Sequence, residues 1–144
     1  MSGTGLAVFD STVQKTNIWL DDIMHELQWN HRERAYHALR AVLHTLRDHL
    51  TIDEAVQLAA QLPLLIRGMY YDGWKPSRVP VKERRWDQFV AHVAEAFALD
   101  PDADAAKVTE AVFGVMSRHM TEGEIADVKR CLPENLRSHW PSKG

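Results

Sequence analysis

The stretch LTIDEAVQLAAQLPLLIRG, residues 50–68, decides the fold class of this 144-residue chain. Its apolar residues recur every three or four positions, which is the spacing of one face of a helix. Thr51 followed by Glu54 has the spacing of a capping box, in which each side chain bonds the backbone N–H of the other residue. Because Pro63 has no N–H, we expect a helix to end there and a short new helix to begin.

The same signature returns in MTEGEIADVKRCLPENLRS, residues 120–138. A shift of 70 positions, from Pro63 to Pro133, superimposes the two stretches without a gap, and the apolar positions of an earlier helix follow the same shift. The matched pairs are Thr51/Thr121, Glu54/Glu124, Leu62/Leu132, Arg67/Arg137, Trp19/Phe89, Leu20/Val90, Ile23/Val93 and Leu27/Phe97. Such a period indicates an internal repeat.

We therefore predict an all-α fold, a helical bundle of two tandem three-helix repeats. It would have six main helices, with the third helix of each repeat broken at Leu-Pro. Repeat 1 would span about residues 9–70, a linker about 71–80 and repeat 2 about 81–140, within a single compact domain of residues 1–144. A three-helix unit of this size buries little apolar surface, so two units are expected to share one core.

Two helices are expected before residue 50. The first would run over residues 11–28 with Asp10 as its N-cap, and the second would begin after Asn30, which has Glu33 in capping-box spacing. The apolar faces that we expect to be buried are Val13, Leu20, Ile23, Met24 and Leu27 in the first helix, and Tyr36, Leu39, Val42, Leu43 and Leu46 in the second.

The composition limits the classes of function. Hydrophobic residues make up 45% of the chain and charged residues 26%, as in ordinary globular proteins. The net charge of −3 disfavours binding to nucleic acid through a general cationic field. We find no signal peptide and no apolar run of the roughly 18 residues that span a bilayer. We expect a cytoplasmic protein that has no membrane partner.

No pattern signals catalysis or a metal centre. Cys131 is the only cysteine, which excludes an internal disulfide and a thiolate cluster. None of the eight histidines has ligand spacing, and His37 and His44 lie about 10 Å apart along a helix. His49 and His119 are expected to interact, as protonated imidazoles, with the negative C-terminal ends of their helices. We predict no catalytic residue, no metal and no cofactor. An enzymatic function remains an open alternative.

Residues near the junction of the repeats form the candidate contact surface. Three large aromatic residues precede a segment, residues 75–85, that has five basic residues and one acidic residue. Aromatic side chains beside cations are common in contact surfaces. Alternatively, the aromatic rings cover the seam between the repeats while the cationic groups lie in water. The residues of this candidate binding site are Arg67, Tyr70, Tyr71, Trp74 and Arg78.

These observations favour a non-enzymatic binding or protein-interaction module, with an unidentified protein partner or a second copy of the chain. The alternative is a small-ligand- or metal-binding protein, or an enzyme, with a pocket between the helical repeats. The number of histidines and Arg67 motivate that alternative. Nucleic acid binding through residues 75–85 is disfavoured by the overall negative charge.

From Phe9 to Trp140 the sequence resembles the bacterial family called domain of unknown function 2267. The resemblance rests on Ala-Gln-Leu-Pro at residues 60–63, Ile-Arg-Gly at 66–68 and Tyr-Asp-Gly-Trp at 71–74. It implies a small helical bacterial protein of the cytoplasm and carries over no catalytic residue. Asp72 stands where relatives more often have glutamate, which is a conservative difference.

Overall fold

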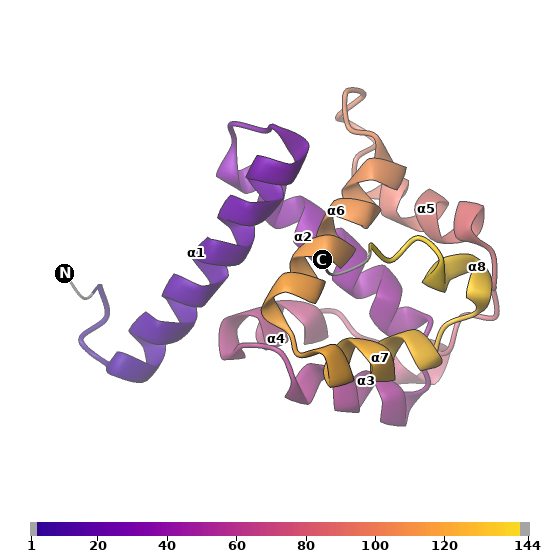
Figure 1. Ribbon diagram of the computed structural model, residues 1–144, viewed down its shortest axis with the longest axis horizontal. Helices are drawn as coiled ribbons and strands as arrows, with labels where there is room; N and C mark the ends of the chain where they lie inside the picture. Colours follow the sequence, from indigo (N-terminus) through magenta and orange to yellow (C-terminus); the bar gives the residue numbers. More distant parts are fainter. Residues whose placement is uncertain (1–2, 142–144) are drawn as a thin grey trace.

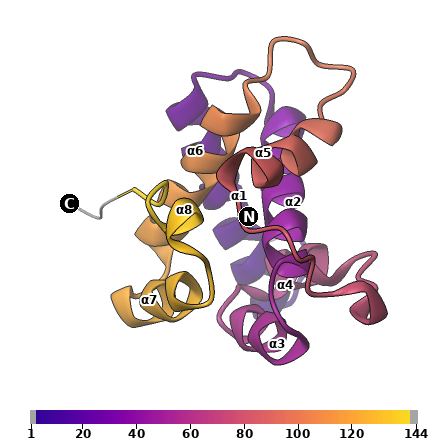
Figure 2. The same ribbon diagram turned by 90° about the vertical axis from the view of Figure 1, so that its right-hand side faces the viewer.

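The computed structural model describes residues 3–141 and is all-helical over that range, as the sequence predicts (Figures 1 and 2). The described residues contain no strand, and no helix among them is long and apolar enough to cross a membrane. The helices are α1 (Ala7–Leu27), α2 (Arg32–Asp48), α3 (Ile52–Ala60), α4 (Leu64–Tyr71), the 3₁₀ helix η1 (Pro76–Arg78), α5 (Trp86–Glu95), α6 (Ala105–His119), α7 (Glu122–Arg130) and α8 (Glu134–Arg137).

The core is built around α2 and α6. These helices contact each other and α1, and α5 also packs against both. In addition α2 packs against α4, and α6 packs against α7. Large rings fill the space on the α6 side: Phe113 lies 5.8 Å from Phe89 and stacks on Trp140 at 4.0 Å between ring centroids. Trp140 also donates its indole N–H to the Ser117 hydroxyl, so the end of the described chain is anchored in the core.

Both predicted capping boxes are confirmed. The Thr51 hydroxyl accepts the Glu54 N–H at 3.2 Å, and the Glu54 carboxylate accepts the Thr51 N–H at 2.9 Å. Thr121 and Glu124 make the same two bonds at 3.1 and 2.9 Å. The two Leu-Pro steps also act as predicted, because Pro63 and Pro133 stand at the N-cap positions of α4 and α8.

The predicted N-caps of α1 and α2 are wrong, although α2 does begin after Asn30. α1 begins at Ala7, and Asp10 lies in its first turn. The Asp10 carboxylate accepts hydrogen bonds from the N–H and hydroxyl groups of Thr4, so it holds the preceding segment and does not cap the helix. α2 has His31 as its N-cap, without a side-chain bond, so Asn30 does not form the expected capping box.

The predicted buried faces are largely correct. Leu20, Ile23, Leu39, Val42, Leu43 and Leu46 are buried, while Met24, Leu27 and Tyr36 are half-buried. Val13 is an exception, since 40% of its surface is exposed. It lies on the part of α1, residues 7–15, in which no residue is buried. Helical periodicity identifies the apolar side of such a segment but does not show whether another element covers it.

The last turn of α2 holds the end of α4. The buried Arg47 guanidinium donates to the carbonyl oxygens of Tyr70 at 2.8 Å and Asp72 at 3.0 Å, and it also bonds the Asp48 carboxylate. These carbonyls lack helical partners because they lie at the helix end. The Asp48 carbonyl in turn accepts the N–H of Val81, so the irregular segment of residues 72–85 is attached to the same turn.

We expect Thr51→Ala and Thr121→Ala each to lower the free energy of unfolding by about 1 kcal/mol, because each change removes a helix cap. Urea denaturation followed by circular dichroism measures this loss. Ser11→Ala, on an exposed position of α1 without a capping role, is the control. Unchanged stability in both threonine variants would contradict the assignment of these caps.

Candidate functional site

Two of the predicted contact residues, Arg67 and Tyr70, form hydrogen bonds with the backbone of their own chain. Arg67 donates from Nε to the carbonyl oxygen of Ala59 at 2.8 Å and from Nη2 to that of Leu62 at 2.9 Å, which closes the corner between α3 and α4. Tyr70 is fully buried, and its hydroxyl donates to the Ala55 carbonyl at 2.8 Å. Burial raises the pKa of Tyr70 above its usual range. Tyr70 therefore lies in the core and is not on the surface.

The other three residues of that site lie closer to solvent. Tyr71 and Trp74 are half-buried, with their ring centroids 5.5 Å apart, and both pack against the core. The indole nitrogen of Trp74 is buried without a hydrogen-bond partner in the described residues. Arg78 is exposed in η1. The structure brings Tyr70, Tyr71 and Trp74 together, and binding of a partner there stays a prediction.

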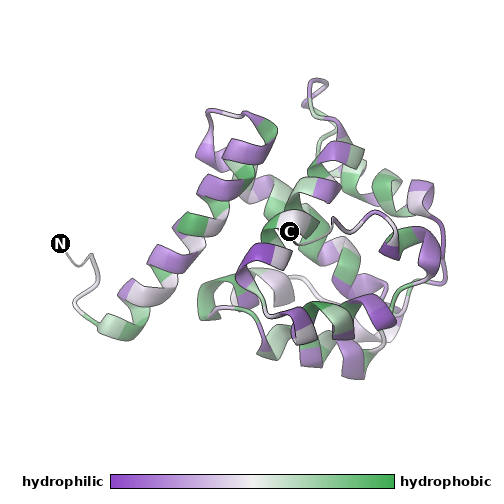
Figure 3. Ribbon diagram, viewed as in Figure 1, coloured by the Kyte–Doolittle hydropathy of each residue, from purple (hydrophilic) through white to green (hydrophobic). Residues whose placement is uncertain are grey.

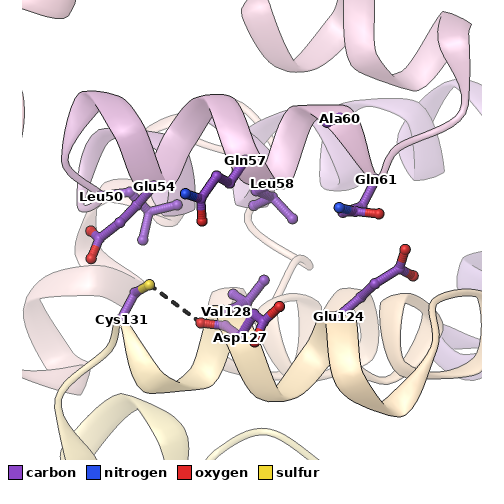
Figure 4. Close-up of a pocket in the computed structure, with 10 residues that line it drawn as sticks. All are labelled: Leu50, Glu54, Gln57, Leu58, Ala60, Gln61, Glu124, Asp127, Val128 and Cys131. Atoms are coloured by element: carbon purple, nitrogen blue, oxygen red, sulfur yellow. Dashed lines mark hydrogen bonds between the residues drawn. The ribbon is translucent and has the colours of Figure 1, made fainter.

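A cavity lies between α3 and α7, which belong to the two predicted repeats (Figure 4). The sequence pointed to a pocket between the repeats only in the alternative hypothesis, and none of the predicted site residues lines it. The two helices run side by side in opposite directions and enclose about 220 Å³. The lining residues are Leu50, Glu54, Gln57, Leu58, Ala60 and Gln61 around α3, and Glu124, Asp127, Val128 and Cys131 around α7. We call this space the α3–α7 cleft.

The cleft has polar ends and an apolar middle. Leu58 and Val128 are buried and face each other across its centre. Glu54 lies at the end where Cys131 stands, and Glu124 lies at the other end, opposite Gln61 (Figure 4). The two glutamates are the capping-box residues that the sequence identified, but the sequence did not indicate that they face one cavity.

Cys131 is a protonated thiol at neutral pH. Burial, together with the nearby Glu54 carboxylate, raises the pKa of Cys131 to about 11. The thiol points along its own helix and donates to the Asp127 carbonyl at 3.3 Å. A thiolate is needed for nucleophilic attack or metal binding, so this cysteine is poorly suited to either role.

A second hollow of about 380 Å³ adjoins the cleft, since Glu54 and Cys131 line both. Lys82 and Arg84 line its outer wall and make no ion pair among the described residues. His49 lies on its inner wall and bonds the Thr45 carbonyl at 2.7 Å in the last turn of α2. His49 thus contacts its helix end as expected, but burial lowers the pKa of the ring, so it is not the protonated group that the sequence predicts.

Histidines in this region do not form a metal site. Burial lowers the pKa of His49, whose Nε2 is buried without a partner, and its ring lies 6.0 Å from that of His92. His92 pairs with Glu83 at 3.0 Å. Among residues 3–141 no group of three histidine, cysteine or acidic side chains is placed to hold a metal ion.

His119 differs from the expected role at its helix end. Its Nε2 lies 2.6 Å from the Asp22 carboxylate, and its ring stacks on Trp19 with centroids 5.5 Å apart. Arg118 also pairs with Asp22 and with Glu26. The end of α6 is thus tied to the middle of α1, a contact between distant segments that helix position alone does not predict.

The sequence matches a family model described as "Uncharacterized conserved protein (DUF2267)" over residues 16–139. The chain belongs to this family. The DUF2267 match includes the α3–α7 cleft, the Leu-Pro corners and the aromatic junction. It begins at Thr16, which is the first buried residue of α1. No curated protein matches the chain.

We expect Cys131 to react slowly with iodoacetamide. A thiol pKa of about 11 leaves about a hundredfold less thiolate at pH 8 than the usual value near 9 does. Because the raised pKa delays ionisation, the reaction rate should still be rising above pH 10. Glu54→Gln should accelerate the reaction, since glutamine keeps the capping box but carries no negative charge. Mass spectrometry measures the rates. A rate equal to that of an unstructured peptide thiol would refute the buried setting.

Proposed function

We propose that this protein is a non-enzymatic protein-interaction module that pairs with a second copy of itself. Its docking surface, the α1–α4 face, consists of Leu6, Phe9, Val13, Leu64 and Leu65. Each of these apolar residues has between 40% and 53% of its surface exposed. Exposed large apolar side chains that gather at one place mark interaction surfaces, whereas single scattered ones do not.

The starts of α1 and α4 meet at a hydrogen bond. The backbone N–H of Leu65 donates to the Thr12 hydroxyl at 2.9 Å, and the two helices are in contact. Beyond this point the first turns of α1 project away from the remaining helices (Figure 1). The hydropathy view shows apolar residues on both the projecting end of α1 and α4 (Figure 3).

A partner that covers the projecting part of α1 would stabilise it. Packing of an apolar face supplies most helical stability in proteins. Residues 7–15 have no buried side chain to provide it. Covering each half-exposed leucine, valine or phenylalanine would contribute about 1 kcal/mol.

A second copy is the partner that the charge of this face favours. The five residues are uncharged, and the first turn of α4 contains no acidic residue. Two copies of such a face can meet across a two-fold axis without bringing like charges together. The same face offers little to nucleic acid, which binds mainly through cationic groups.

The titratable groups support a non-enzymatic role. The Cys131 thiol is protonated. One ring nitrogen of His44 bonds the Met69 carbonyl, and one ring nitrogen of His49 bonds the Thr45 carbonyl. Burial lowers the pKa of both histidines, which keeps them neutral in these bonds. A catalytic base must reach a substrate proton, and these groups instead stabilise helix ends.

We also infer that the fold consists of two tandem three-helix units. Positions that differ by 70 are buried in both halves, which supports the duplication read from the sequence. The pairs are Trp19/Phe89, Ile23/Val93, Val42/Val112, Leu43/Phe113, Leu46/Met116, Leu50/Met120, Ala55/Ile125, Leu58/Val128, Leu62/Leu132, Ile66/Leu136 and Tyr70/Trp140.

Self-association tests the proposal. We expect the wild type to dimerise with rising concentration in analytical ultracentrifugation. Phe9→Glu and Leu64→Glu should each raise the dissociation constant at least tenfold, because a carboxylate would be buried unpaired in an apolar interface.

Leu99→Glu is the matched control, because Leu99 is 99% exposed and lies outside the α1–α4 face. It should dimerise as the wild type does, and all three variants should keep the wild-type helical content. A wild type that stays monomeric at its highest soluble concentration would refute the pairing. Equal loss of dimer in the Leu99 variant would refute this choice of surface.

A further inference from the structure

The α3–α7 cleft is independent of the α1–α4 face, and docking of a second copy does not account for its lining. It is a cavity of about 220 Å³ with a buried apolar floor, Leu58 and Val128, between carboxylates at its two ends. Amide groups of Gln57 and Gln61 also reach into it (Figure 4). Such a combination of apolar floor and a few polar groups is typical of small-molecule sites.

The charges of the lining are unbalanced. Glu54, Glu124 and Asp127 line the cleft, and no basic side chain does. Asp127 is neutralised by Arg130 on its own helix. Glu54 and Glu124 make no ion pair within residues 3–141, so both ends of the cavity carry an uncompensated negative charge.

The two glutamates are held in place by their own helix caps. One carboxylate oxygen of each accepts a threonine N–H at 2.9 Å, from Thr51 and from Thr121. The second oxygen of Glu124 has no hydrogen-bond partner in the described part of the chain, and the Glu54 carboxylate also interacts with the Cys131 thiol. The caps thus fix the two carboxylates before any ligand arrives, which lowers the entropy that binding must overcome.

The length of the cleft limits the ligand. The Glu54 carboxylate lies back at Thr51, whose N–H it accepts, and the Glu124 carboxylate lies at the Gln61 end (Figure 4). Thr51 and Gln61 are ten residues apart, which corresponds to about 15 Å along the helix. An ammonium–carboxylate hydrogen bond occupies about 2.8 Å at each end. The remaining length, roughly 9 Å, suits two nitrogen atoms joined by a chain of about six methylene groups.

We propose that the α3–α7 cleft binds a linear aliphatic diamine of about six carbon atoms, with one ammonium group at Glu54 and the other at Glu124. The methylene groups lie over Leu58 and Val128, and the side-chain carbonyls of Gln57 and Gln61 accept further ammonium hydrogens. A ligand with two positive ends and an apolar middle matches the cleft along its whole length. A single amine would leave one carboxylate unpaired.

Lys82 and Arg84 make the two ends unequal. They line the adjoining hollow on the far side of Glu54 and Cys131, so their positive charge weakens the attraction of an ammonium group to Glu54. None of the described residues that line the cleft itself is basic. The contribution of Glu124 to affinity should therefore exceed that of Glu54.

Isothermal titration calorimetry with 1,6-diaminohexane at low ionic strength tests the proposal on the full chain. Glu54→Gln and Glu124→Gln each remove one charge, and glutamine keeps the capping box, so the helices stay intact. Loss of a charge-assisted hydrogen bond should weaken binding tenfold or more for Glu124→Gln and somewhat less for Glu54→Gln. The double variant should show no binding.

Glu122→Gln is the matched control, since Glu122 lies in the first turn of α7 with the same charge but does not line the cleft. It should bind as the wild type does. 1-Aminohexane should bind at least tenfold more weakly than the diamine, because it can pair with only one carboxylate.

Four outcomes would overturn the proposal. The first three are no detectable heat with the diamine, undiminished affinity in the double variant, and an equal loss in Glu122→Gln, which would indicate attraction by surface charge in general. The fourth is equal binding of 1-aminohexane, which would refute the two-ended arrangement. None of these results depends on dimerisation, so the cleft and the α1–α4 face are tested separately.

Discussion

The structure depends on the buried guanidinium of Arg47, which has only 4% of its surface exposed. A buried cation is tolerated only when its charge is paired and its N–H groups are bonded. Asp48 supplies the charge, and the carbonyl oxygens of Tyr70 and Asp72 supply acceptors. These demands fix the end of α4 against the last turn of α2. The Val81 N–H bonds the Asp48 carbonyl, so the chain enters its second half from the same point.

Neighbouring contacts on α2 extend this attachment. His44 bonds the Met69 carbonyl at 2.7 Å, and Arg40 pairs with Asp72 at 2.7 Å. The hydrogen bond from Arg40 holds the pKa of Asp72 below its usual range, although this exposed pair adds little to stability. One face of α2 therefore bonds α4 while other faces pack on α1, α5 and α6. With α4 fixed, α3 packs against it and also meets α7, which α6 supports.

The sequence predicted the features that depend on neighbours along the chain. A capping box needs only a threonine and a glutamate three residues later, and a proline stops a helix wherever it stands. The role of Arg47 was missed because its partners lie 23 and 25 residues away. The start of α1 was misplaced because its first turns have no buried face, and Asp10 is equally suited to an N-cap or a first turn. The cleft depends on α3 meeting α7, which no local pattern contains.

Composition could not separate contact residues from structural ones at the aromatic junction. Arg67 and Tyr70 have the chemistry of interface residues, yet each satisfies backbone carbonyls of α3 or of the corner after it. The sequence shows the same arginine or tyrosine whether the side chain binds a partner or bonds the backbone of its own chain. Only the position of its polar atoms relative to buried acceptors decides between them.

Because α3 and α7 belong to a single polypeptide, the two ends of the cleft between them can carry different residues. If two identical chains supplied these helices, a substitution at one end of the cleft would also appear at the other end. Here the position beside Glu124 holds an amide, Gln61, while the position beside Glu54 holds a thiol, Cys131. The residues at the two ends of the cleft can thus change independently. An elongated ligand with unlike ends would therefore bind in one preferred orientation.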